Sequence, residues 1–344
     1  MLTRFAVAAF LVTIMLPAGI NAGQSPASGS SSAKKTWRAP RTASGHPDLQ
    51  GVWANNVITP LQRPKIWEGR EVLTTEEVEI LKQKVAGAAE TDGDAIFAGE
   101  DLIQAALSDS KAKSYDPTTG NYNHFWLVER DYDNRTSLIV EPSNGRLPAL
   151  TPAAQTRQQA AAERRRLHPA DGPEDRPLGE RCITFGSPRL GAGYNSYYQI
   201  LQTPDHVVIM MEMAHDARVI PLDGRPHVPD RIRQWHGDSR GRWEGDTLVV
   251  ETRNYSPKSN FMGAAENLHV VERFTRVGPT TLKYEVSISD PTTWTEPWTA
   301  VIPLKHSDDK VYEYACHEGN IGLFGILSGH RAEEAAGKNA GSTQ

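Results

Sequence analysis

The feature that most constrains the fold is a succession of short apolar or alternating runs that occupies the chain from Tyr197 onward. Turn residues such as Pro204-Asp205 and Gly278-Pro279 separate these runs at the spacing typical of consecutive antiparallel strands. The expected strands are Gln199 to Thr203, Val207 to Met213, Arg218 to Leu222, Arg242-Trp243, Thr247 to Thr252, Leu268 to Val277, Leu282 to Ser289, Trp298 to Lys305 and Val311 to His317. A long meander tends to close on itself because closure removes unpaired sheet edges. The sequence therefore predicts an all-β protein, an antiparallel up-and-down β-barrel with a few surface helices.

Three local patterns complete the expected elements. Asn144-Gly145 predicts a hairpin between Ser137 to Glu141 and Arg146 to Leu150, because both turn residues tolerate positive φ. Thr74 and Glu77 form a capping box that predicts a helix to about Ala89. Thr151 followed by Pro152 predicts a second helix to Leu167, on the surface because its apolar stripe is weak.

The N-terminus has the pattern of a cleavable secretory signal. Arg4 is followed by the apolar run Phe5 to Leu16, then by Pro17-Ala18-Gly19 and a cleavage site near Ala22. An uncleaved anchor is the alternative, but the run is shorter than the roughly 20 apolar residues of a spanning helix. We therefore expect a periplasmic or secreted protein with no membrane span after cleavage.

The rest of the chain is expected to form one domain. Residues 23–45 begin with a Ser/Ala/Gly-rich stretch typical of a flexible linker, residues 46–331 carry the strand pattern, and residues 332–344 form a polar tail. The formal net charge of -5 argues against a nucleic-acid partner. Cys182 and Cys316 can pair after export to an oxidising compartment, or can stay as two buried thiols.

Two resemblances follow from short motifs. Gly51-Val52-Trp53 is similar to the Gly-x-Trp start of lipocalin-type barrels. The chain from about residue 46 to 331 also resembles a group of functionally unassigned proteins exported by environmental bacteria, which implies no particular activity. That second resemblance rests on Pro47 to Trp53, His215 to Arg218, Asp238 to Thr247, Leu268 to Phe274, Asp290 to Trp294 and Tyr314 to Asn320.

Strand parity indicates two candidate carboxylates. Asp290 continues the apolar row of Leu282 to Ile288, so it is expected at the mouth of the barrel, where desolvation favours acid or base work. Glu272 shares a face with Val270 and Phe274. The structural alternatives are that Asp290 caps a turn and that Glu272 pairs with an arginine.

Histidines beside carboxylates give the remaining catalytic candidates. His215 and Asp216 follow the second expected strand at a turn, and His317 ends the last one. A histidine there is a candidate general base because its ordinary pKa lies near neutrality. A hydrogen-bonded structural histidine is the alternative for both.

Residues near strand ends are candidates for ligand contact. Aromatic rings beside amide and guanidinium groups are typical of sites for sugars or aromatic ligands, and the alternative is that the rings fill the barrel end as core. These candidates are Tyr194, Asn195, Arg218, Trp294, Trp298 and Tyr314. No motif with metal-ligand or cofactor spacing is found, so neither a metal nor a cofactor is predicted.

These observations favour an exported enzyme that performs acid–base chemistry on a small organic or carbohydrate ligand inside the barrel. Elimination, isomerisation or hydrolysis without a redox cofactor is expected, with lyase or isomerase chemistry before hydrolysis. His215 would be the base, and Asp290 or Glu272 the acid. The alternative is a lipocalin-like carrier or sensor of a lipophilic ligand.

Overall fold

The computed structural model describes residues 37–89, 103, 106–108, 130–192 and 194–337. The expected signal peptide, most of the expected linker and the last residues of the expected tail lie outside this part of the chain. The chain divides into two units, Met1–Trp37 and Arg38–Gln344, and every element below belongs to the second. No helix in the described residues is long and apolar enough to cross a membrane.

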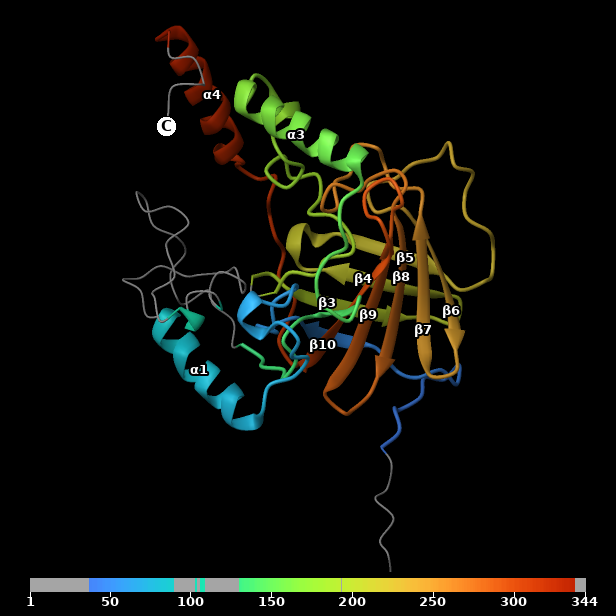
Figure 1. Cartoon of the computed structure of the whole chain (residues 1–344). Helices are drawn as coiled ribbons and strands as arrows, with labels where there is room; N and C mark the ends of the chain where they lie inside the picture. The colour runs from blue at the N-terminus through green and yellow to red at the C-terminus, as the bar shows by residue number, and fades with distance from the viewer. Residues whose placement is uncertain (1–36, 90–102, 104–105, 109–129, 193, 338–344) are drawn as a thin grey trace, which may run out of the picture. The chain divides into compact units, whose positions relative to one another are not determined.

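The second unit is built on one antiparallel sheet that curves into a nearly closed barrel (Figure 1). Nine strands follow the order β5-β4-β3-β1-β10-β9-β8-β7-β6, and β2 pairs with β10. The predicted all-β barrel is confirmed. The strands are β1 (Gly51–Ala54), β2 (Ile139–Glu141), β3 (Tyr197–Gln202), β4 (His206–Met211), β5 (Ala217–Pro221), β6 (Asp238–Glu244), β7 (Thr247–Arg253), β8 (His269–Arg276), β9 (Thr281–Ser289) and β10 (Trp298–Ser307).

The barrel has a seam between β5 and β6, which are the two ends of the strand order. Each of the eight neighbouring pairs along the path is antiparallel, so the first and last of nine strands run in the same direction. The two strands lie close together, because a Cβ added at Gly241 on β6 would come within 2.9 Å of Ile220 on β5. Because the number of strands is odd, β5 and β6 run parallel to each other. The antiparallel pairing that links all the other neighbours along the path cannot form between them.

The side chains that fill the interior are the ones that alternation along the strands predicts. Along β9, Leu282, Tyr284, Val286 and Ile288 are buried and alternate with half-buried residues. The Tyr284 ring stacks on its cross-strand neighbour Phe274 at 4.7 Å between ring centroids. The interior is thus a packed core, in which burial of apolar surface stabilises the barrel.

Three longer helices accompany the sheet in the described residues: α1 (Thr75–Ala89), α3 (Pro152–Leu167) and α4 (Ile321–Ala335). The two predicted helices, α1 and α3, are both confirmed. The Glu77 carboxylate accepts from the Thr74 N–H at 2.8 Å, which completes the capping box, and the Thr151 hydroxyl caps α3.

Three sequence expectations about elements differ from the structure. Gly145 does adopt positive φ in a turn, but Arg146 to Leu150 forms no strand, and β2 pairs with β10 instead of forming a hairpin. Residues 311–317 are not a strand either. The α4 helix begins at Ile321, where no helix was predicted, and continues to Ala335 into the expected tail. Local turn signals cannot decide which strand a segment pairs with, because that choice depends on the sheet edge available.

Of the two alternatives for the cysteines, the structure shows the disulfide. Cys182 and Cys316 are bonded, with their Cα atoms 5.5 Å apart and 134 residues between them in sequence. The bond ties the loop after α3 to the segment that follows β10.

Candidate functional site

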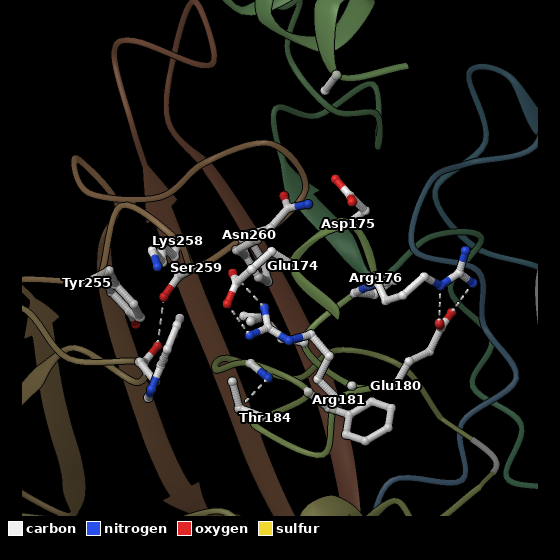
Figure 2. Close-up of a pocket in the computed structure, with 18 of the residues that line it drawn as sticks. Glu174, Asp175, Arg176, Glu180, Arg181, Thr184, Tyr255, Lys258, Ser259 and Asn260 are labelled. Carbon is white, nitrogen blue, oxygen red and sulfur yellow. Dashed lines mark hydrogen bonds and ion pairs between the residues drawn. The ribbon is translucent and has the colours of Figure 1, made fainter. Parts of the chain in front are cut away.

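Two pockets lie next to each other outside the packed interior and share Trp235 in their walls. The first, which we call the loop pocket, has a volume of about 730 Å³ and lies between the end of α3, the segment 174–187 and the segment 255–268 (Figure 2). The second, the seam pocket, has a volume of about 560 Å³ and is lined by residues 217–219 of β5, 233–237 and 238–240 of β6. Both volumes are in the range of small-molecule sites.

A threonine, an aspartate and a histidine meet where the two pockets adjoin. His236 lines the seam pocket and Thr184 lines the loop pocket. His236 Nε2 lies 3.1 Å from Asp216 Oδ1, and the Thr184 hydroxyl donates to Asp216 Oδ2 at 2.7 Å. We call these three residues the His236 cluster.

The hydrogen bonds of the His236 cluster indicate the tautomer of a neutral imidazole. The Thr184 hydroxyl donates its one hydrogen to Asp216, so it accepts from His236 Nε2, which lies 3.2 Å away and carries the ring hydrogen. The other ring nitrogen, Nδ1, is buried and has no hydrogen-bond partner in the described part of the chain. A neutral His236 therefore keeps a lone pair on Nδ1 that no described group contacts, and the side chain as a whole is 19% exposed.

Two constraints place the His236 cluster. The turn from β4 to β5 passes through positive φ at both Ala214 and His215, immediately before Asp216. Such backbone is uncommon for residues other than glycine and persists where the surroundings hold it. The Cys182–Cys316 bond lies two residues before Thr184 and so holds the loop that carries the hydroxyl.

Paired charges and aromatic rings line the loop pocket. Arg181 pairs with Glu174 at 2.7 Å, and Arg176 pairs with Glu180 at the same distance (Figure 2). Arg164 likewise pairs with Asp175. Arg165 and Lys258 also line the pocket, where Trp235, Tyr255 and Phe261 supply rings. The pocket thus carries more cationic than anionic side chains over a partly aromatic wall.

A buried polar network lies inside the barrel beside the seam pocket. Arg218 lines that pocket, and its guanidinium donates to both oxygens of Glu272 at 2.5 and 2.9 Å. The Tyr284 hydroxyl donates to Glu272 Oε1 at 2.8 Å. Burial acts to lower the pKa of Arg218, but attraction to Glu272 outweighs it and raises the pKa, so Arg218 stays charged.

The carboxylates predicted as acids are engaged in structural contacts. Glu272 is fully buried against Arg218, which is the ion-pair alternative considered for it. Asp290 accepts from the Thr292 N–H at 2.8 Å and from the hydroxyls of Thr292 and Thr293, so it caps a turn. Neither lines the loop pocket or the seam pocket.

The predicted histidines do not join the carboxylates Glu272 and Asp290. His215 is exposed and its Nδ1 lies 3.2 Å from the Tyr314 carbonyl, and His317 is exposed beyond the disulfide. Of the predicted catalytic residues, Asp216 belongs to the His236 cluster. The predicted site is therefore not a single constellation in one pocket.

The predicted ligand-contacting residues are also divided. Trp294 and Trp298 are buried, meet edge to face at 5.7 Å between centroids, and belong to the core. The Tyr314 ring contacts Phe185, a lining residue of the loop pocket. Arg189 donates to the Tyr194 carbonyl, and Asn195 has positive φ in the same turn. Of the ligand-contacting set, Arg218 lines a pocket.

Sequence reasoning missed His236 and Thr184. His236 lies in an irregular segment between two strands, and Thr184 lies in a Gly/Pro/Arg-rich loop. The alternation of side chains along a strand therefore could not predict where either residue points. Neither residue lies in a motif whose spacing predicts a chemical role.

Comparisons with family models, with curated proteins and with solved structures found no match to this chain. The geometry of the two pockets and of the His236 cluster is therefore the guide to function.

Proposed function

We propose that the protein is a periplasmic or secreted enzyme that uses His236 as a general base on a small organic or carbohydrate ligand. One observation supports this most: an imidazole held by a carboxylate at Nε2, with a buried and unpartnered Nδ1, lies in the wall of a pocket of ligand size. The expected base therefore changes from His215 to His236, while Asp216 keeps a part in the site.

The proposed chemistry follows from the different surroundings of the two ring nitrogens of His236. Nδ1 is buried, so the proposed step needs the ring to turn toward the seam pocket. There Nδ1 takes a proton from the ligand or from a water beside it, and Asp216 stabilises the positive charge that develops on the ring. The Thr184 hydroxyl donates to the second Asp216 oxygen and so holds the carboxylate in place. Elimination, isomerisation and hydrolysis each begin with such a proton transfer.

The pocket linings favour a polar ligand. The guanidinium of Arg218 and the ammonium of Lys258 can donate hydrogen bonds, while Trp235 and Tyr255 offer flat apolar surface. This combination suits a sugar or an aromatic compound that carries a hydroxyl or carboxylate group.

A carrier or sensor is the second candidate. In a carrier, carboxylates near the ligand should be paired, and Glu272 is paired with Arg218. The same pockets would then bind a ligand without converting it.

The test is a screen of purified protein against chromogenic glycosides and esters. For any substrate that is turned over, His236→Gln should lower kcat by about 100-fold or more, the usual contribution of a general base. Asp216→Asn should also lower kcat because it removes the negative charge that stabilises the protonated ring.

The matched control is His269→Gln. His269 also pairs with a carboxylate, Glu251 at 2.9 Å, and it lines neither pocket, so this variant should keep wild-type kcat. Equal turnover by wild type and His236→Gln would contradict the proposed base. A ligand that binds to the pockets and is never converted would favour the carrier.

A further inference from the structure

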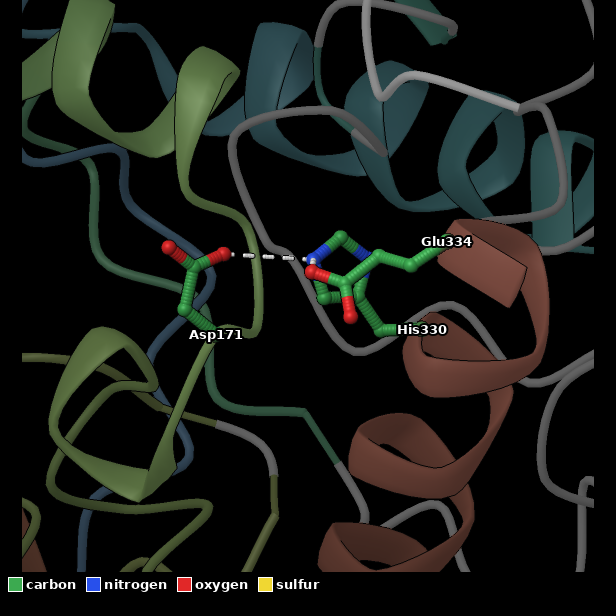
Figure 3. Close-up of side chains that lie close together, drawn as sticks. All are labelled: Asp171, His330 and Glu334. Carbon is green, nitrogen blue, oxygen red and sulfur yellow. Dashed lines mark hydrogen bonds and ion pairs between the residues drawn. The ribbon is translucent and has the colours of Figure 1, made fainter. Parts of the chain in front are cut away.

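A second group of ionisable side chains lies away from the His236 cluster, where α4 meets the loop after α3. His330 and Glu334 stand one turn apart on α4, and Asp171 faces them from the loop (Figure 3). His330 Nε2 lies 3.2 Å from Asp171 Oδ1 and 3.6 Å from Glu334 Oε1. We call these three residues the α4 cluster.

The spacing of these three atoms matches the ligand set of a tetrahedral metal ion. Zinc–nitrogen and zinc–oxygen bonds of about 2.0–2.2 Å at a tetrahedral angle put neighbouring ligand atoms about 3.4 Å apart. The two observed distances lie on either side of that value, and the three ligand atoms all lie within 4.8 Å of one another. Histidine and glutamate at i and i+4 share one helix face, so α4 presents both to the same point.

Two of the three ligands of the α4 cluster are held by a neighbour through their second oxygen, and a further carboxylate lies near the third ligand. His168 Nδ1 lies 2.6 Å from Asp171 Oδ2, and Arg331 lies 3.1 Å from Glu334 Oε2. Glu333 Oε2 is 4.0 Å from His330 Nδ1. Outer partners of this kind orient the ligands of metal sites and are typical of them.

The charge around His330 also favours a bound cation. The residue is 8% exposed and has three carboxylates, of Asp171, Glu333 and Glu334, within 4.0 Å of its ring nitrogens. A cation bound there would be attracted by all three carboxylates. A divalent cation leaves the imidazole neutral and brings both carboxylates of the α4 cluster to one centre.

We propose that Asp171, His330 and Glu334 bind a divalent transition-metal ion, with zinc as the probe, and that this ion fastens α4 to the loop after α3. An imidazole ligand favours zinc and its neighbours over magnesium or calcium. The other described contacts between α4 and this loop include the hydrogen bond from Arg331 to the Ala170 carbonyl. Three protein ligands leave the fourth position for water. The site stands on observations separate from those of the proposed enzyme function.

The experiment is a zinc titration of the full chain, expressed without a polyhistidine tag and freed of metal by a chelator, in competition with a chromophoric zinc indicator. We expect one zinc ion per chain. Asp171→Asn, His330→Gln and Glu334→Gln should each weaken zinc binding by about tenfold or more, since loss of an outer partner alone costs 10–100-fold. The matched control is His269→Gln, whose histidine lies in a pair with Glu251 outside the α4 cluster.

Hydrogen exchange gives a second readout that does not depend on activity. Zinc should slow amide exchange in α4 of the wild type and leave it unchanged in His330→Gln, with far-ultraviolet circular dichroism confirming that each variant is folded. Zinc binding of equal strength in wild type and His330→Gln would overturn the proposal. So would a wild type that takes up no zinc at micromolar concentrations, or one in which zinc leaves α4 exchange unchanged.

Discussion

At the scale of single residues, the most constrained group is the ion pair inside the barrel. Arg218 is 6% exposed and Glu272 is fully buried, and the Tyr284 hydroxyl completes the contacts of Glu272. A buried ion pair adds little net stability, but the loss of one partner leaves the other charge buried and unpaired. The main effect of the pair on stability is therefore expected when one of its two partners is removed.

We predict that Glu272→Gln lowers the free energy of unfolding by about 3–5 kcal/mol, because it leaves the Arg218 charge without its partner. Urea denaturation followed by tryptophan fluorescence measures this change. The double variant Arg218→Met, Glu272→Leu should recover much of the loss, and a single variant as stable as the wild type would contradict this account.

Alkaline pH should destabilise the fold through its buried tyrosines. Burial raises the pKa of Tyr198 to about 12, whereas an unfolded tyrosine ionises near pH 10. The folded chain then keeps a proton that the unfolded chain loses, so stability falls as pH rises from 10 to 12, by about 3 kcal/mol over that window.

Tyr198→Phe should make this decline shallower. It also removes the hydrogen bond from the Tyr198 hydroxyl to the Arg189 carbonyl, so the variant starts from a lower stability at pH 7. Urea midpoints at pH 9 and pH 11 measure the slope, and Tyr312→Phe, at an exposed position, is the control that should keep the wild-type slope. Identical slopes in wild type and Tyr198→Phe would argue against this assignment.

At the scale of elements, the seam between β5 and β6 depends on close approach of two strands that run in the same direction. Gly241 on β6 permits it, because an added Cβ would lie 2.6 Å from Leu222 Cδ2 and 2.9 Å from Ile220 Cγ2. Side chains at this join also line the seam pocket, so a wider seam would alter the site.

We predict that Gly241→Ala lowers the free energy of unfolding by about 1–3 kcal/mol, the usual cost of an extra methyl group in a packed contact. Gly87→Ala in α1 is the control. Nothing lies within 4 Å of its added Cβ, so the substitution should raise stability by about 0.5–1 kcal/mol. Thermal denaturation of both variants measures the contrast, and a Gly241→Ala protein as stable as Gly87→Ala would show that the seam is loosely packed.

At the scale of the whole molecule, the disulfide joins segments that are far apart in sequence. Closing a loop of 134 residues restricts the unfolded chain, and the loss of such a bond typically costs about 2–5 kcal/mol. The bond also holds the loop that carries Thr184.

We predict that Cys182→Ser with Cys316→Ser lowers the free energy of unfolding by that amount and also lowers any turnover that depends on His236. Urea unfolding with and without a thiol reductant measures the first effect. The reductant should destabilise the wild type and leave the double variant unchanged. An equal response of both proteins would contradict the assignment.

The amino-acid sequence determined the local elements of this protein. Alternation along Leu282 to Ile288 specifies a strand with one buried face, and the Thr74–Glu77 capping box specifies the start of α1. These signals are readable because they depend on neighbours within a few residues. The pairing of the cysteines could also be anticipated as one of two alternatives, since the chain has only two of them and both are bonded.

The tertiary structure decided which strands pair and which distant residues come together. It paired β2 with β10 in place of the expected hairpin, and it formed α4 where no helix was predicted. It also joined His236 to Thr184 across 52 residues and to Asp216. It also placed Glu272 against Arg218, so strand parity gave the right face but could not name the partner. The physical reason is that alternation fixes which way a side chain points, whereas contacts between distant segments depend on how nine strands close and on where irregular loops cross the barrel end.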